Sequence, residues 1–327
     1  MMTHTSRLLA GNPLGDPNER QFPVYLPPHY DATSTRRWPV VFLLAGYSGH
    51  GRLMIAERSF AERIDQRLDR LIATGRLKEA VFVMPDAFTR LGGSQYVDSQ
   101  GTGPYESYIT KELVPFIDHE FRIDPDRRGV AGKSSGGYGA LRLSVYHPDV
   151  FHMAAVLSGD AGWEHCYYPD LADLVCALDP YSGSVAAFLA DFAQKTQRKI
   201  SKRDFAAMSL IAMSACYSPD ATADCGLALP VHWPTGRLKD DVWARWLAFD
   251  PLRFLPHAAQ LRRVGGVWVE CGRADEYRLQ IGARQMAEIL AQRDVPCHYE
   301  EFDDGHTGLD WRLDGALPWL VDALAGL

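Results

Sequence analysis

The chain has 327 residues, of which 46% are hydrophobic, 11% aromatic and 23% charged, and its formal net charge is −7. This composition is typical of a globular protein with a large core, and the acidic balance gives little support to a nucleic-acid partner. The sequence has no run of about 18 apolar residues and no secretion signal at its start, which predicts a cytoplasmic protein without a membrane span.

Strands and helices are expected to alternate through the first half of the chain. Short apolar runs bounded by glycine or proline predict strands at 20–28, 38–47, 80–87 and 127–132. Apolar residues at helical spacing predict helices over 52–77 and 105–121, the second with a kink at Pro115. A further helix is expected to begin at 135 and to stop before Pro148.

The same alternation returns toward the end of the chain. Strands are expected at 153–159, 265–272 and 296–304, and helices at 277–295 and 307–327. Strands that alternate with helices predict an α/β fold with a doubly wound, mostly parallel sheet. No internal repeat is found.

Residues 160–250 interrupt this alternation and are too long for a simple connection. We expect them to form a largely helical cap inserted into a single domain that spans 1–327. One or two of its aromatic residues, Trp163 among them, are expected to face a binding site, and the others to form the core of the cap. The basic cluster at 195–203 is expected to be a solvated helix face.

The six cysteines show no CxxC pair and no zinc-type spacing with histidines. We therefore expect free thiols in a reducing compartment, with neither a metal nor a cofactor. Whether Cys216 and Cys225 pair is left open, as is the oligomeric state, including a homo-oligomer.

The stretch "VAGKSSGGYGA", residues 130–140, contains a candidate nucleophile. Gly132, Ser134 and Gly136 satisfy G-x-S-x-G, whereas centring the pattern on Ser135 fails because position 133 is lysine. A nucleophile on a sharp strand-to-helix turn needs small neighbours two residues away, and here a predicted strand precedes the motif and a helix follows it. A glycine-rich turn with an ordinary serine is the alternative.

A serine nucleophile on such a strand-to-helix turn needs an acid and a histidine base. Both follow it along the chain, first the acid and then the histidine. His306 comes directly after the last predicted strand, and Asp275 lies just beyond the preceding strand. Glu276, Glu270, Asp303 and Asp304 are rivals for the acid, because Asp275 is favoured by position more than by residue type.

An oxyanion hole would require two backbone N–H groups. Ser135, the residue after the nucleophile, should supply one, and Tyr47, in the turn after the strand segment "VVFLLAG", the other, with Ser48 as the next candidate. The polar loop at 93–103, which carries Tyr96, either borders the site and binds substrate or is a plain surface loop.

With these residues in place, the chain resembles the putative-esterase branch of the α/β-hydrolases, which includes S-formylglutathione hydrolases, feruloyl esterases, enterochelin esterases and antigen 85 mycolyltransferases. The resemblance spans the chain outside the expected cap and rests on these segments in this order: "FPVYLPPHYD", "WPVVFLLAGYSG", "YESYITKELVPFIDHEFRI", "GKSSGGYGALRLSVYHPDVF", "LSG", "FDPL", "CGRADEY" and "GHTGLDW". Two positions depart from the family pattern. Ala45 stands where the family often has histidine, and Ser135 where it often has methionine.

The residues and the resemblance together predict a serine hydrolase that cleaves small-molecule carboxylic esters through Ser134, His306 and Asp275. An acyltransferase of the same fold is one alternative, and a catalytically silent binding protein of the hydrolase fold is another. The acyl and alcohol parts of the substrate are not readable from the sequence.

Overall fold

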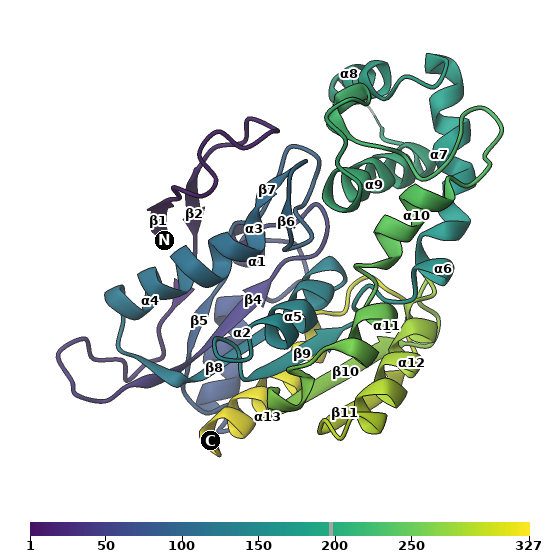
Figure 1. Ribbon diagram of the computed structural model, residues 1–327. Coiled ribbons are helices and arrows are strands. Elements are labelled where there is room, and N and C mark those ends of the chain that lie inside the picture. Colours follow the sequence, from purple (N-terminus) through teal and green to yellow (C-terminus); the bar gives the residue numbers. More distant parts are fainter. Residues whose placement is uncertain (196–198) are drawn as a thin grey trace.

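A computed structural model describes residues 1–195 and 199–327 (Figure 1). Residues 196–198 of the basic cluster lie outside the described residues. Of the rest, residues 199–201 are exposed as expected but are not helical, because one helix ends at Lys195 and the next begins at Lys202. Among the described helices, none is both long and apolar enough to cross a membrane. All six cysteines are free, with Cys216 buried and Cys225 exposed.

The centre of the molecule is a seven-stranded sheet in the order β11-β10-β9-β8-β4-β5-β3. The strands are β3 (Val24–Tyr25), β4 (Trp38–Leu44), β5 (Val81–Val83), β8 (Ile123–Lys133), β9 (Met153–Leu157), β10 (Gly266–Gly272) and β11 (Cys297–Phe302). Strand β3 pairs antiparallel with β5 at one edge, and all other pairs are parallel. The predicted mostly parallel sheet is confirmed.

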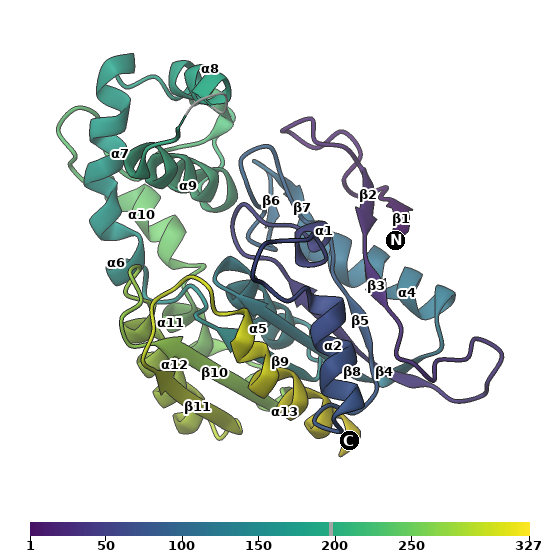
Figure 2. The same ribbon diagram turned by 180° about the vertical axis from the view of Figure 1, so that it is seen from behind.

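Helices cover both faces of this sheet (Figures 1 and 2). Alternate residues of β4 point into two separate cores, Phe42 into one and Val41 and Leu43 into the other. The first core contains α4 (Val114–Glu120), α5 (Ser135–Tyr146) and α12 (Leu279–Gln292), and the second contains α2 (Ile64–Ala73) and α13 (Leu313–Ala325). A strand covered on both faces is apolar throughout, which explains the continuous hydrophobic runs in the sequence.

Two expected helices differ from the structure. The helix expected over 52–77 is divided into α1 (Gly51–Met54) and α2, with an irregular segment that includes the fully exposed Phe60 between them. The helix expected over 105–121 consists of α3 (Tyr105–Ser107), a π-helical segment (Tyr108–Leu113) and α4. The helical run is continuous from Tyr105 to Glu120, and its π-helical segment ends two residues before Pro115; the kink expected at Pro115 stays a prediction.

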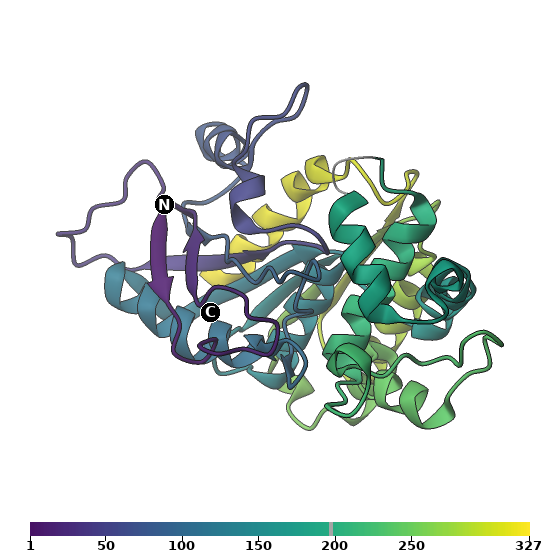
Figure 3. The same ribbon diagram turned by 90° about the horizontal axis from the view of Figure 1, so that it is seen from above.

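Residues between β9 and β10 form a run of helices, namely α6 (Trp163–Cys166), α7 (Leu171–Leu178), α8 (Val185–Lys195), α9 (Lys202–Tyr217), α10 (Asp240–Leu247) and α11 (Pro251–Phe254). Helices α6 to α10 stand at one end of the sheet (Figures 1 and 3). The remaining strands are short: β1 (Met2–Thr5) pairs with β2 (Glu19–Phe22), and β6 (Asp98–Ser99) with β7 (Gly103–Pro104).

The carboxyl ends of the parallel strands meet at the edge from which the helical run begins. This edge also carries the turns that follow β4, β8, β10 and β11, where the sequence placed its candidate residues. Ligands of open α/β sheets bind at such an edge, so the fold brings the candidates to the expected place.

Candidate active site

Ser134 occupies a strained turn between β8 and α5. Its φ is 57° and its ψ −128°, a conformation that L-residues rarely adopt. The two flanking glycines are required by space. A Cβ on Gly132 would lie 2.3 Å from the carbonyl oxygen of Gly136, and a Cβ on Gly136 would lie 2.2 Å from that of Leu44. The G-x-S-x-G spacing thus has the physical cause expected for a serine on a sharp elbow.

His306 and Asp275 form a buried hydrogen-bonded pair. Asp275 follows β10, His306 follows β11, and His306 Nδ1 lies 2.7 Å from Asp275 Oδ2. The other carboxylate oxygen of Asp275 accepts the backbone N–H of Tyr277 at 2.9 Å, which fixes the carboxylate's orientation. The ring of Tyr277 packs edge-on against the imidazole at 4.8 Å between centroids. The pair therefore has the contacts that hold an imidazole in one tautomer.

The rival acids make other contacts in this structure. Glu276 accepts the backbone N–H of His306 at 2.7 Å, so it holds the loop rather than the imidazole. Glu270 is buried in β10 and pairs with Arg312, while Asp303 pairs with Arg273 at the surface. Asp304 accepts the backbone N–H of Gly305. Within the described residues, Asp275 is the acid whose carboxylate is hydrogen-bonded to the ring of His306.

The hydroxyl of Ser134 points to an acid that the sequence reasoning missed. Ser134 Oγ donates to Asp160 Oδ1 at 3.4 Å, and among the described residues no hydrogen bond joins Ser134 to His306. Asp160 also accepts Ser135 Oγ at 3.1 Å and Tyr167 Oη at 2.7 Å. It is buried, and burial raises its pKa, while the hydrogen bond from Tyr167 opposes that rise. It lies three residues after β9, at the same edge of the sheet, a position that by itself does not distinguish it from other aspartates after strands.

Replacement of Asp160 by asparagine should make stability less dependent on pH. Because the folded pKa of Asp160 is raised, its contribution is fully present below the unfolded value near 3.8 and is lost as pH rises through the folded pKa. Each pH unit of that window corresponds to about 1.4 kcal/mol, or roughly 2–4 °C in Tm for a chain of this size class. Across a pH range from acid to neutral, we expect the Tm difference between Asp160→Asn and wild type to move in favour of the variant as pH rises above the unfolded value toward the folded pKa.

The control for this measurement is Glu288→Gln, which neutralises an exposed carboxylate on α12. Its Tm difference from wild type at each pH gives the effect of removing one exposed negative charge. A Tm difference for Asp160→Asn that follows this control at every pH would mean that the Asp160 carboxyl does not titrate abnormally in the folded protein.

The two expected oxyanion donors line one small cavity. Tyr47 and Ser135 both border a space of about 10 Å³, enough for one water-sized atom. Throughout 1–195 and 199–327, no hydrogen-bond acceptor is found for either backbone N–H. Gln95, which also lines this space, donates from Nε2 to Ser135 Oγ at 2.9 Å.

The two aromatic residues expected to bind substrate are buried. Trp163 is 0% exposed and stacks on Tyr217 at 4.4 Å within the aromatic core of the helical run. This burial speaks against a substrate contact for Trp163, whose environment is a packed core. Tyr96 is also buried, and its hydroxyl donates to the carbonyl oxygen of Ala45 at 2.8 Å, so it supports the turn that carries Tyr47.

Comparison with known proteins adds relatives to this geometry. Residues 17–318 match the family described as "Putative esterase". Over 158 residues the chain is 29% identical to the uncharacterized protein YbbA of Bacillus subtilis, which covers 45% of this chain and 59% of the relative. Over 157 residues it is 27% identical to the S-formylglutathione hydrolase of Bos taurus, covering 42% and 51%. The matches thus span little more than half the length of these two curated relatives.

A solved structure of a ferulic acid esterase has the same fold. It superimposes with a TM-score of 0.62 at 21% identity, over 98% of this chain and 96% of that one. The α/β-hydrolase fold expected from the sequence is confirmed. Since the family match covers most of its residues, the chain belongs to the "Putative esterase" family.

Proposed function

We propose that the chain is a serine esterase in which Ser134, His306 and Asp275 form a catalytic triad. The observation that carries this proposal is the 2.7 Å contact between His306 Nδ1 and Asp275 Oδ2, made at the sheet edge where Ser134 stands on its elbow. Names among the relatives, which include feruloyl esterases and S-formylglutathione hydrolases, support ester cleavage as the reaction.

The first half of the reaction acylates Ser134. The serine side chain turns from Asp160 toward His306 Nε2, which takes the hydroxyl proton as Oγ attacks the ester carbonyl. Asp275 keeps the proton on Nδ1 and stabilises the imidazolium that forms. The backbone N–H groups of Ser135 and Tyr47 hold the oxyanion of the tetrahedral intermediate. His306 then returns the proton to the leaving oxygen, and the acyl group stays on Ser134.

The second half of the reaction uses water in place of the hydroxyl of Ser134. His306 takes a proton from the water, the resulting hydroxide attacks the acyl carbonyl, and Ser134 leaves with the proton that His306 returns. An alcohol that enters instead of water would give acyl transfer, which needs no other group in the site. The two outcomes therefore differ only in the acceptor.

The test is hydrolysis of p-nitrophenyl esters from acetate to dodecanoate, with labelling by a fluorophosphonate probe. We expect turnover of at least the short esters and a covalent adduct on the peptide that contains Ser134. Product analysis with added methanol separates hydrolysis from acyl transfer. Neither turnover nor an adduct would favour the silent binding protein instead.

A further inference from the structure

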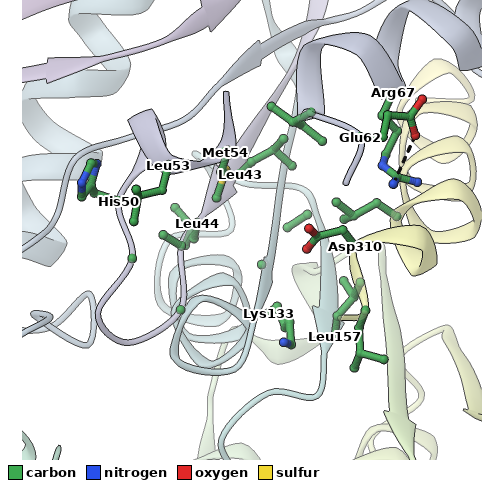
Figure 4. A pocket seen from close by; sticks show the side chains of 18 of the residues that line it. Leu43, Leu44, His50, Leu53, Met54, Glu62, Arg67, Lys133, Leu157 and Asp310 are labelled. Carbon is green, nitrogen blue, oxygen red and sulfur yellow. Dashed lines mark ion pairs between the residues drawn. The ribbon is translucent and has the colours of Figure 1, made fainter. Parts of the chain in front are cut away.

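A largely apolar cavity of about 210 Å³ lies beside the elbow (Figure 4). Leu44, Leu53, Met54, Leu157 and Leu309 supply much of its wall. A cavity of about 150 Å³ can hold a benzene ring, so this one has room for one substituted aromatic ring or a short aliphatic chain. The mechanism proposed above assigns no role to it.

The cavity is lined by the residues directly before the nucleophile and by residues of the loop that follows the base. Its wall includes Gly132 and Lys133, the two residues directly before Ser134. Gly46 also lines it, and a Cβ at that position would lie 3.2 Å from the carbonyl oxygen of Lys133 and 3.4 Å from Ser134 Cβ, so a side chain there would narrow the space beside the nucleophile. Leu309, three residues after His306, closes the other side.

Among the charged side chains that line the cavity, the ammonium of Lys133 has no partner of opposite charge in the described parts of the chain. Arg58 pairs with Asp310 at 2.7 Å, and Arg67 pairs with Glu62 at 3.2 Å. For Lys133, no ion pair is found anywhere in the described parts of the chain. The wall therefore carries one net positive charge, located on the residue next to the nucleophile (Figure 4).

This ammonium is incompletely solvated. Lys133 is half-buried, and burial lowers its pKa, while the carboxylates of Asp310, Asp275 and Glu276 act in the opposite direction. A charged group among apolar side chains gains from a partner of opposite charge, because water no longer compensates it fully. An anionic group on a bound molecule would supply that partner.

The proposed reaction determines which part of an ester can reach this cavity. The leaving oxygen must receive its proton from His306, so the leaving group lies on the side of the His306 loop, where Leu309 and Asp310 line the cavity. On the other flank of Ser134, buried Asp160 and Gln95 fill the space, and the backbone donors there take the carbonyl oxygen.

We propose that this cavity holds the leaving group of the substrate and that Lys133 binds a carboxylate on it. The proposal rests on the proposed esterase function and adds a substrate class to it: esters whose alcohol part combines an apolar body with an anionic group. Lys133 is then a residue that determines specificity for the leaving group.

The test compares matched aryl acetates that differ in charge on the leaving group. The substrates are 3- and 4-acetoxybenzoate and their methyl esters, and each kcat/KM is divided by the rate of alkaline hydrolysis of the same ester. We expect wild type to prefer the carboxylate of at least one pair by roughly tenfold, the size of one charge-assisted hydrogen bond at a partly exposed site. In Lys133→Met the ratio should fall to about one, and Lys133→Arg should restore part of it.

Lys111→Met is the matched control, because it removes an exposed lysine that does not line this cavity. It should leave the ratio of the two esters as in wild type. Serine-dependent turnover without a preference for the carboxylate, or with a preference that Lys133→Met retains, would overturn the inference and leave the esterase proposal intact.

A binding measurement separates the two proposals if no ester is turned over. Calorimetry with Ser134→Ala should give roughly tenfold tighter binding of 4-hydroxybenzoate than of 4-hydroxybenzamide. The added Lys133→Met substitution should remove the difference. Equal binding of the two compounds would overturn the proposed carboxylate site at Lys133, whereas selective binding without turnover would overturn only the esterase function.

Discussion

Ser134→Ala is expected to lower kcat for p-nitrophenyl acetate by roughly a million-fold, because loss of a triad nucleophile removes the covalent route altogether. Ser134 is the residue at the strained elbow, with φ 57°. The close packing of the flanking glycines fixes this turn, so a neighbouring residue cannot take the same position. The fluorophosphonate adduct should disappear together with the turnover. Binding of substrate should survive, since the cavity and the backbone donors remain.

The adjacent serine provides the control for this experiment. Ser135→Ala keeps the backbone N–H proposed for the oxyanion and removes only a hydroxyl that is hydrogen-bonded to Asp160 and Gln95. We expect this substitution to lower kcat by no more than about tenfold, the effect of a lost buried hydrogen bond. A large loss in Ser135→Ala with turnover retained in Ser134→Ala would move the nucleophile to Ser135 and overturn the reading of the motif.

The sheet and the position of its turns could be predicted because they depend on patterns that sequence displays directly. Continuous apolar runs indicate strands covered on both faces, and chain order then places Ser134, Asp275 and His306 after three different strands. Parallel strands end at a common edge, so residues far apart in sequence were expected together. The contact between Asp275 and His306 follows from that topology.

The break in the helix expected over 52–77 could not be predicted from periodicity. Apolar spacing is read as a sign of residues that pack on the sheet, but Leu53 and Met54 line the cavity beside the elbow instead, and Leu53 is exposed. The apolar spacing therefore continues through residues 52–77, although the helix is interrupted between α1 and α2. A segment that lines a site satisfies the same hydrophobic rule as one that packs on a sheet.

Asp160 and Trp163 show the same limit for single residues. A lone aspartate after a strand carries no spacing that marks it, and only the fold brings it to Ser134, Ser135 and Tyr167. An aromatic residue in an insertion can line a pocket or fill a core. Trp163 lies in a core, because the rings of Tyr217 and Trp246 pack against its ring.

Asp275→Asn is expected to lower kcat by about 10⁴-fold while changing the volume of the side chain little. Asp275 Oδ2 accepts the proton of His306 Nδ1, whereas an asparagine can turn its amide N–H₂ toward that nitrogen. The imidazole would then carry its proton on Nε2, where it cannot accept the proton of Ser134. The measurement is kcat across the pH range, with Tm recorded for each variant to exclude unfolding.

Glu276→Gln is the matched control for that result. Glu276 neighbours Asp275 and holds the backbone N–H of His306 at 2.7 Å, a contact that the amide oxygen of glutamine can keep. We expect it to cost no more than about tenfold, because the loop stays in place and the imidazole keeps its acid. The opposite result would be a loss of about 10⁴-fold in kcat for Glu276→Gln with Asp275→Asn still active. In that case Glu276 would be the acid that orients His306. The imidazole would then have to turn away from the buried carboxylate it contacts in this structure.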